Sequence, residues 1–171
     1  MGFLSAEGFL FVLGGQNENG DTLGSGEQYD PDANAWSPLP PMLEERHSFG
    51  VVEIDGVIYI LGGEDGDREL ISMESYDTCT KTWSKQQNMT MVRKIGCYAS
   101  MKKKIYAMGG GSYGKLFESV ECYDPKTQQW TAICPLKERR FGAVACGVGM
   151  ELYVFGGVRS RENEQNSEMV A

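Results

Sequence analysis

A repeat of about 47 residues runs through this chain of 171 residues and limits its fold more than any other sequence feature. Pairs of adjacent glycines, Tyr-Asp dipeptides and the three tryptophans all recur at this interval, and a glutamate stands two residues before each tyrosine. The markers are Gly14-Gly15, Gly62-Gly63, Gly109-Gly110 and Gly156-Gly157; Tyr29-Asp30, Tyr76-Asp77 and Tyr123-Asp124; Trp36, Trp83 and Trp130; and Glu27, Glu74 and Glu121. The chain is therefore predicted to consist of successive copies of one structural unit.

Each unit has the pattern of four short β-strands. In the second unit, an apolar run over residues 49–54 is followed by the hairpin dipeptide Asp55-Gly56 and by a second apolar run over residues 57–61. A polar loop, a strand ending in Tyr-Asp, a turn and a strand containing the tryptophan complete the unit. We therefore predict an all-β, partial β-propeller with about three four-stranded blades and the first hairpin of a fourth.

The repeat also sets the predicted domain boundaries. Residues 1–45 form a first blade with an incomplete first strand, residues 46–92 and 93–138 form two further blades, and residues 139–159 form the opening hairpin of a fourth. Residues 160–171 are rich in Glu, Asn, Gln and Ser, which predicts a disordered tail. The first and last blades are each expected to present a face that a neighbouring blade would cover.

The marker residues resemble those of the kelch family. The shared pattern is two apolar residues before a Gly pair, then Glu-x-Tyr-Asp, then Trp, then an arginine-containing turn, and it covers residues 3–157. The resemblance implies a kelch-type propeller that binds proteins. Residues 136–157 are most similar to a BTB-BACK-kelch protein, in which the BTB part binds a cullin and the propeller holds an intermediate-filament protein for ubiquitylation.

The resemblance leaves two functions open. The first is the substrate-recognition part of a cullin-RING ubiquitin ligase adaptor that is cytoplasmic and associated with the cytoskeleton. The second is a scaffold that binds actin or other filaments and has no role in ubiquitylation. Because the chain contains no BTB or BACK segment, we do not expect it to bind a cullin by itself.

Composition argues against several other functions. The net charge of −8 and the scattered basic residues disfavour nucleic acid as a partner, and no apolar run approaches the roughly 20 residues that span a bilayer. A copper oxidase with a kelch-like propeller would need imidazole ligands, but His47 is the one histidine. We therefore expect no catalysis, no cofactor and no metal.

The partner-binding surface is predicted in loops at one mouth of the propeller. One kind of loop links the Trp strand to the next blade, and the other follows the Gly pair. The predicted partner-binding residues are Arg46, Ser48, Arg93, Lys94, Arg139, Arg140, Tyr113 and Arg159. The resemblance places Ser48, Lys94 and Arg140, each just before an apolar-Gly pair, at equivalent positions of the substrate pocket.

Two interpretations of the basic residues in the links remain open. Guanidinium groups on a rigid rim suit the carboxylates of an acidic peptide. Alternatively, Arg46, Arg93 and Arg139 bond carbonyl groups or the repeated glutamates within the protein. The repeated Glu27, Glu74 and Glu121 are expected to be held between blades with a partner, because a buried carboxylate needs one. The five cysteines, most of which lie in apolar runs, are expected to be reduced and buried.

Overall fold

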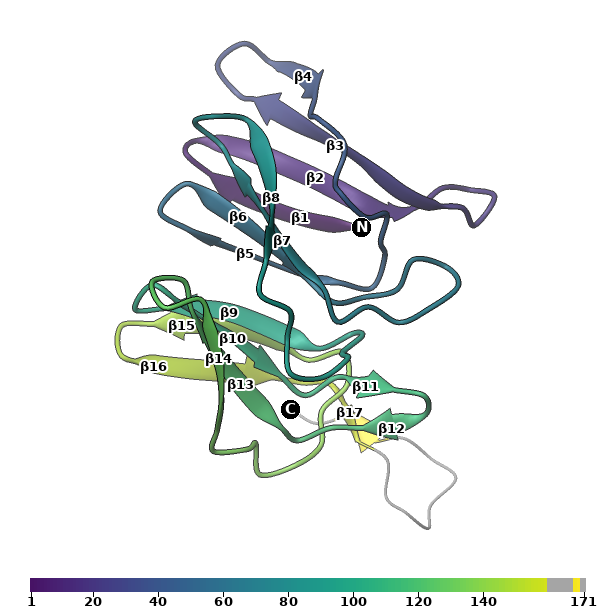
Figure 1. The fold of residues 1–171 in the computed structure, drawn as a ribbon, viewed down its shortest axis with the longest axis vertical. Coiled ribbons are helices and arrows are strands. Elements are labelled where there is room, and N and C mark those ends of the chain that lie inside the picture. The colour runs from purple at the N-terminus through teal and green to yellow at the C-terminus, as the bar shows by residue number, and fades with distance from the viewer. Residues whose placement is uncertain (160–167, 170–171) are drawn as a thin grey trace.

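The computed structural model describes residues 1–159 and 168–169, which form antiparallel sheets and contain no helix (Figure 1). The first sheet contains β1 (Gly2–Ala6), β2 (Phe9–Gln16), β3 (Thr22–Asp30) and β4 (Ala35–Pro38). The second contains β5 (Gly50–Ile54), β6 (Val57–Leu61), β7 (Met73–Asp77) and β8 (Thr82–Gln86). The third contains β9 (Cys97–Met101), β10 (Lys104–Met108), β13 (Val120–Asp124) and β14 (Gln129–Ile133). A last hairpin contains β15 (Val144–Val148) and β16 (Glu151–Phe155).

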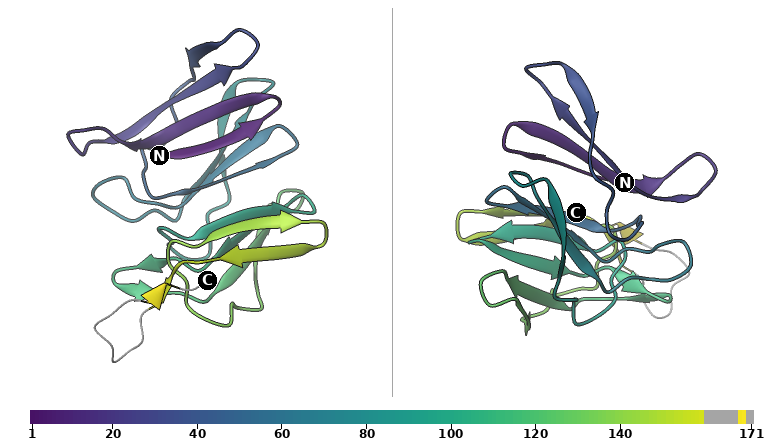
Figure 2. Two further views of the ribbon diagram at one scale, coloured as in Figure 1. Left: turned by 180° about the vertical axis from the view of Figure 1, so that it is seen from behind. Right: turned by 45° about the horizontal axis from the view of Figure 1, so that its top comes forward.

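This arrangement confirms the predicted partial propeller. Strands follow one another in chain order within each four-stranded sheet, and the last hairpin pairs in the same way as the first two strands of the other sheets. The first strands lie next to one another, since β1 contacts β5, β5 contacts β9, and β9 contacts β15. The two views of Figure 2 show the sheets following one another, with the last hairpin beside the third sheet.

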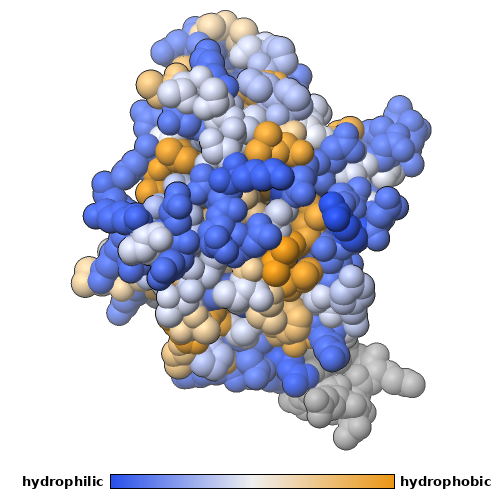
Figure 3. Space-filling model, viewed as in Figure 1, coloured by the Kyte–Doolittle hydropathy of each residue, from blue (hydrophilic) through white to orange (hydrophobic). Residues whose placement is uncertain are grey.

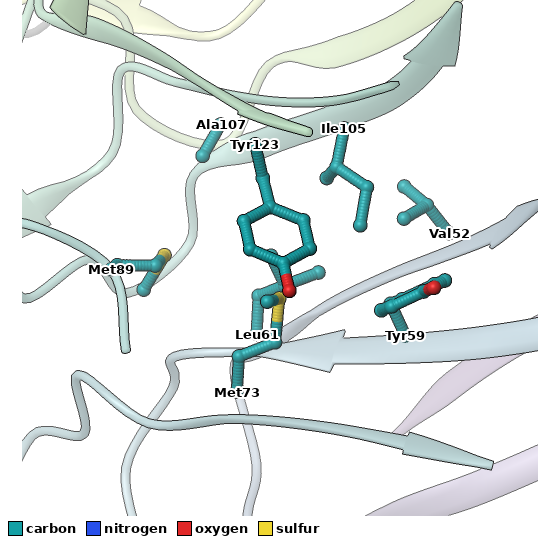
Figure 4. Close-up of a cluster of buried hydrophobic side chains, with 8 residues drawn as sticks. All are labelled: Val52, Tyr59, Leu61, Met73, Met89, Ile105, Ala107 and Tyr123. Atoms are coloured by element: carbon teal, nitrogen blue, oxygen red, sulfur yellow. The ribbon is translucent and has the colours of Figure 1, made fainter. Parts of the chain in front are cut away.

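Apolar clusters between successive sheets hold the array together. Between the second and third sheets, Tyr123 extends toward Tyr59 and Met73 in a cluster that also contains Leu61 and Ile105 (Figure 4). A second cluster, which includes Phe11 and Tyr76, joins the first and second sheets. Hydrophilic side chains dominate the face shown in Figure 3, with smaller hydrophobic groups between them. Burial of the two clusters is therefore the main force that joins one sheet to the next.

The repeated tyrosines and tryptophans occupy the same places in successive sheets. Tyr76 and Tyr123 each reach the preceding sheet, where their rings lie 6.4 Å from those of Phe11 and Tyr59, respectively. The indole Nε1 of Trp83 donates to the Pro40 carbonyl at 2.9 Å, and that of Trp130 donates to the Gln87 carbonyl at 3.0 Å. The tyrosines thus pack each sheet against the preceding one, and the tryptophans bond it to the chain segment that follows the preceding sheet.

The repeated Gly pair is required by a close backbone contact. Gly62 and Gly109 both have positive φ angles, +63° and +58°. A Cβ at Gly62 would lie 2.5 Å from the carbonyl oxygen of Arg93, and one at Gly109 would lie 2.4 Å from that of Arg140. Only glycine combines this backbone conformation with this approach of the next link.

Some details differ from the sequence-based predictions. Although the first strand was predicted to be incomplete, β1 has a length of five residues, as β5 and β9 do. The loop between the Gly pair and Tyr-Asp is one residue longer in the first sheet than in the second and third. Two small hairpins were not predicted: β11 (Gly111–Ser112) with β12 (Lys115–Leu116), and β17 (Val158–Arg159) with β18 (Glu168–Met169). Apart from β18, the predicted disordered tail lies outside the described residues.

Candidate functional site

The candidate site is the rim formed by the links between sheets and the loops that follow the Gly pairs. The three links have a common register, which is fixed by their arginines. Arg46, Arg93 and Arg140 each donate from Nη1 to the carbonyl of the first glycine of a pair, at 2.9, 2.8 and 2.6 Å. These arginines stand 47 residues apart, so they are the structural equivalents of one another.

This register corrects the predicted equivalence of Ser48, Lys94 and Arg140. The structure instead aligns Ser48 with Ile95 and Gly142, which all have positive φ angles of 56°, 50° and 69°. The prediction counted back from the apolar-Gly pair, but two residues separate Arg46 from that pair, one residue separates Arg93 from it, and none separates Arg140 from it. The arginine sets the register, because β5, β9 and β15 each begin four residues after it, while the apolar-Gly pair shifts by one residue from each link to the next.

Arg46 and Arg93 are interior residues, with relative exposures of 0% and 1%. Arg46 contacts Glu74 at 2.9 Å and Glu44 at 3.0 Å, and Arg93 contacts Glu121 at 3.0 Å. For these two residues the structure favours the second interpretation, in which the guanidinium bonds carbonyls and a repeated glutamate. They are therefore not available to a partner, which corrects their assignment to the binding surface.

The repeated glutamates behave as expected in two of three cases. Glu74 also accepts a hydrogen bond from the backbone N–H of Leu43, and Glu121 accepts one from that of Thr90. Glu27, in contrast, is exposed. The link that supplies the arginine precedes the sheet that supplies the glutamate, and the position 47 residues before Arg46 lies outside this chain. The burial of these carboxylates therefore depends on the preceding link.

The sequence suggested that Arg139 is the equivalent of Arg46 and Arg93 and that Arg140 lines the substrate pocket. In the structure, Arg140 is the equivalent of Arg46 and Arg93. Arg140 occupies the place of the two interior arginines but is only half-buried, and it faces no carboxylate among the described residues. Arg139 has a side-chain exposure of 42%, and its Nε lies 3.5 Å from Glu118. Arg139 therefore contributes to the surface of the rim.

The centre of the rim is a chain of backbone hydrogen bonds between links. The N–H of Ile95 donates to the Ser48 carbonyl at 3.1 Å, and the N–H of Gly142 donates to the Ile95 carbonyl at 2.9 Å. The equivalent residue of each link therefore contacts the one before it. Ser48 is half-buried and Ile95 is exposed, so a partner could contact Ile95 fully and Ser48 in part.

Side chains from three sheets bond to one another around this centre. Nδ1 of His47 lies 3.2 Å from the Thr22 hydroxyl, and its Nε2 lies 3.1 Å from Glu64. Lys94 continues the network to Glu64 at 3.3 Å and Glu69 at 3.6 Å. Glu69 in turn accepts hydrogen bonds from the Ser112 hydroxyl and the Tyr113 N–H. The network ties the loops of the first, second and third sheets together.

The charges of the network stabilise one another. Burial by itself would raise the pKa of Glu69, but the hydrogen bonds from Ser112 and Tyr113 and the charge of Lys94 lower it below its usual value. Nearby, the hydrogen bond from the Arg68 side chain is the main cause that lowers the pKa of Asp65 to about 2. Both carboxylates are therefore ionised at neutral pH.

The rim offers paired cations and one prominent aromatic side chain. Lys94 faces Glu64 and Glu69, Arg159 contacts Glu138 at 2.9 Å, and Arg139 faces Glu118. Tyr113 is 80% exposed at the tip of the β11–β12 hairpin, next to Glu69. Such an aromatic group on a fixed backbone is typical of a contact residue for another protein.

Other features bear on chemistry rather than binding. Within residues 1–159 and 168–169, no group of three or more His, Cys, Asp or Glu side chains is placed to hold a metal ion. The described part of the chain also contains no helix that could span a membrane.

All five cysteines are free thiols. Cys79, Cys134 and Cys146 are exposed, which corrects the expectation that most would be buried. Cys79 lies in the turn between β7 and β8, Cys134 directly follows β14, and Cys146 lies in β15. Burial raises the pKa of the Cys97 thiol to about 11, so this cysteine is unreactive near neutral pH.

Comparisons with known proteins identify the repeat. Residues 2–157 match the model of the KLHDC2/KLHL20/DRC7 Kelch-repeats domain. Gigaxonin from Mus musculus is 83% identical over 99% of this chain, and gigaxonin from Homo sapiens is 81% identical over 99%. The chain spans 28% of the length of each of these two relatives.

A solved structure shares the fold. The structure of YjhT superposes with a TM-score of 0.79 at 18% sequence identity, and the match covers 92% of this chain and 58% of that one. At this level of identity the likeness concerns the fold alone.

Proposed function

Because this chain belongs to the kelch-repeat family, we propose that it recognises a protein substrate for a cullin-RING ubiquitin ligase, as part of a longer adaptor. Membership of the family indicates a protein-interaction module rather than an enzyme. The proposed partners are intermediate-filament proteins, and the proposed location is the cytoplasm, at the cytoskeleton. A cullin would bind through a BTB domain elsewhere in the longer protein.

The observation that carries this proposal is the rim around Tyr113. Tyr113 is exposed while its backbone N–H is held by Glu69, so binding would cost little loss of backbone freedom. Lys94 lies in the same network, and we include Ser48, Arg139 and Arg159 in the proposed binding surface. Because the cations already face carboxylates, a partner would be selected by an aromatic contact and by exchange of ion pairs rather than by net positive charge.

The test is direct binding of a purified intermediate-filament protein to this chain. Replacing Tyr113 by alanine should weaken binding about tenfold or more, the usual effect of removing an aromatic hot spot. Lys94→Glu should also weaken binding. Lys126→Glu is the matched control, because Lys126 is exposed in the turn before β14. A Tyr113→Ala chain that binds as well as the control variant would show that the rim is not the binding surface.

A second measurement separates the adaptor from the filament scaffold. An adaptor lowers the amount of its partner, so loss of the longer protein from cells should raise the steady-state level of the bound filament protein. A scaffold would leave that level unchanged while altering only where the filaments lie.

A further inference from the structure

A cleft of about 530 Å³ lies between the first and second sheets, at the ends of the strands opposite the rim. Residues of the β1–β2, β5–β6 and β7–β8 turns line it. In Figure 1 these turns lie on the left, whereas the loops after the Gly pairs lie on the right. Both sheets have all four of their strands, so complete parts of the fold border the cleft on each side.

Apolar side chains and two carboxylates line this cleft. Phe11 is buried, and Phe9 and Val57 are half-buried. Glu7 comes from the β1–β2 turn and Asp77 from the end of β7, so each sheet supplies one carboxylate. Such a lining suits a side chain that has an apolar stem and a positively charged end, because the stem can be buried while the charge is paired.

Neither carboxylate forms an ion pair with a described residue. Oδ1 of Asp77 accepts hydrogen bonds from the backbone N–H groups of Thr80 and Cys79, which lower the pKa of Asp77 below its usual value. Asp77 is therefore ionised at neutral pH. The Glu7 carboxylate reaches toward the second sheet, since a Cβ at Gly56 would lie 3.5 Å from its Oε1.

The third sheet supplies its own cation at the equivalent position. Asp124 is the equivalent of Asp77, and the Lys104 ammonium group contacts it at 3.0 Å. Lys104 is in turn the equivalent of Val57, so the second sheet has an apolar side chain where the third has an ammonium group. The second sheet thus keeps the carboxylate of this pair and lacks its cation.

Another lysine bridges the two turns at the equivalent interface. Lys103 of the third sheet reaches Asp55 of the second at 2.7 Å. The equivalent of Lys103 is Gly56, which has no side chain, and Glu7 stands next to Gly8, the equivalent of Asp55. The cleft between the first and second sheets therefore has carboxylates where the next interface has carboxylates and lysines.

We propose that this cleft binds a lysine side chain presented by an extended segment of another protein. The methylene groups of the lysine pack on Phe9, Phe11 and Val57. Its ammonium group donates hydrogen bonds to the carboxylates of Glu7 and Asp77. This binding site lies at the opposite end of the strands from the rim and does not depend on the function proposed for the rim.

Charge favours a separate partner over a second copy of this chain. Two chains that each have a net charge of −8 repel one another. Lys81 also lines the cleft, and Lys103 already pairs with Asp55 beside it. The two remaining carboxylates therefore match a single ammonium group better than a densely basic segment.

The test is a titration of the isotope-labelled 171-residue chain with the peptide acetyl-Ala-Lys-Ala-amide, followed through the backbone amide signals in NMR spectra. The signals of Gly56, Val57 and Thr78, which line the cleft, should shift saturably. A peptide with norleucine in place of lysine keeps the apolar stem and lacks the charge. It should bind at least about fivefold more weakly, because the hydrogen bonds to charged groups are lost.

Variants of the chain test the assignment. Glu7→Gln should weaken binding of the lysine peptide about threefold, because one of the two charged acceptors is lost. Glu18→Gln is the matched control, since it removes the same charge from an exposed loop at the rim, and it should alter the affinity less than about twofold. Val57→Lys restores the internal cation that the third sheet has, and it should prevent saturable binding.

Equal binding of the lysine and norleucine peptides would overturn the proposal, as would shifts confined to signals outside the cleft. Equal effects of Glu7→Gln and Glu18→Gln would also overturn it. Glu7 is exposed, so its replacement tests the site even if Val57→Lys disturbs folding. Shifts of the cleft signals with protein concentration alone would mean that a second copy occupies the cleft, which contradicts a separate partner.

Discussion

The interface between the first and second sheets and the interface between the second and third use the same positions but satisfy their polar groups differently. The Tyr123 hydroxyl donates to Oε1 of Gln86 at 3.2 Å. The equivalent Tyr76 hydroxyl is buried and has no hydrogen-bond partner among the described residues, because Leu39 occupies the position equivalent to Gln86. The packing of the tyrosine rings is therefore repeated at both interfaces, whereas the hydrogen bonding of their hydroxyl groups differs between the two.

The buried ion pairs show the same contrast. Arg46 lies between two carboxylates, those of Glu44 and Glu74. Among the described residues Arg93 pairs with one carboxylate, that of Glu121, because Met91 replaces Glu44. Glu121 receives two hydrogen bonds from Thr90, one from the backbone N–H and one from the hydroxyl. The first interface thus concentrates negative charge around its arginine, and the second surrounds a single carboxylate with donors.

The largest expected effect comes from removing these arginines. Arg46→Met and Arg93→Met should each destabilise the chain by about 3–5 kcal/mol, because a buried carboxylate loses its counter-charge. Arg46→Met should cost more, since it leaves two carboxylates in mutual repulsion. The urea midpoints of the two variants measure this difference.

The double variant Arg93→Met/Glu121→Gln is the control for the arginine experiment. It should recover part of the stability, because no unpaired charge remains. Equal midpoints for the two single variants would show that Glu44, at 30% side-chain exposure, is sufficiently hydrated to have no influence.

A smaller effect should separate the two tyrosines. Tyr123→Phe removes a satisfied hydroxyl and should cost about 1 kcal/mol, whereas Tyr76→Phe removes an unsatisfied one and should be neutral or stabilising. Both rings are buried to the same degree, so each variant serves as the packing control for the other. If Tyr76→Phe were as destabilising as Tyr123→Phe in thermal unfolding, the Tyr76 hydroxyl would have a partner in solution.

The smallest effect concerns the rim, where Thr22 and His47 at the first interface correspond to Glu69 and Lys94 at the second. The pKa of Glu69 is lowered in the folded protein, so its contribution to stability is present above the usual carboxyl pKa and is lost as the pH falls through the lowered value. Acid should therefore increase hydrogen exchange at the Tyr113 amide, which donates to Glu69.

Glu69→Gln tests the assignment of this acid effect, because the variant has no carboxylate to titrate. Its Tyr113 amide, corrected for the intrinsic pH dependence of exchange, should respond less to acid than that of the unaltered chain. Identical profiles would mean that another group controls this hairpin.

The strands and the marker residues could be predicted from the sequence because their roles repeat. Each marker makes the same kind of contact in successive repeats of about 47 residues. The Gly pair lies against a backbone carbonyl, the tyrosine packs between sheets, and the tryptophan bonds to the preceding segment. The partial propeller could therefore be predicted from the sequence alone.

The site was only partly predictable, because its register depends on a tertiary contact. Counting from the apolar-Gly pair placed Arg140 with Lys94, although its bond to the Gly156 carbonyl places it with Arg93. The spacing between Arg93 and Arg140 contained that signal. The contacts of Lys94 with Glu64 and Glu69 could not be read in advance, since they join loops whose sequences do not repeat.

The extra residue in the first loop after a Gly pair has a consequence for how such proteins diversify. The position of Glu27 and Tyr29 relative to the later repeats is unchanged by this insertion, since both keep the 47-residue spacing to Glu74 and Tyr76. The scaffold thus tolerates a change of length at the rim without a change in its packed strands. Evolution can therefore alter the shape presented to a partner by lengthening or shortening these loops, one blade at a time, while the inherited framework stays the same.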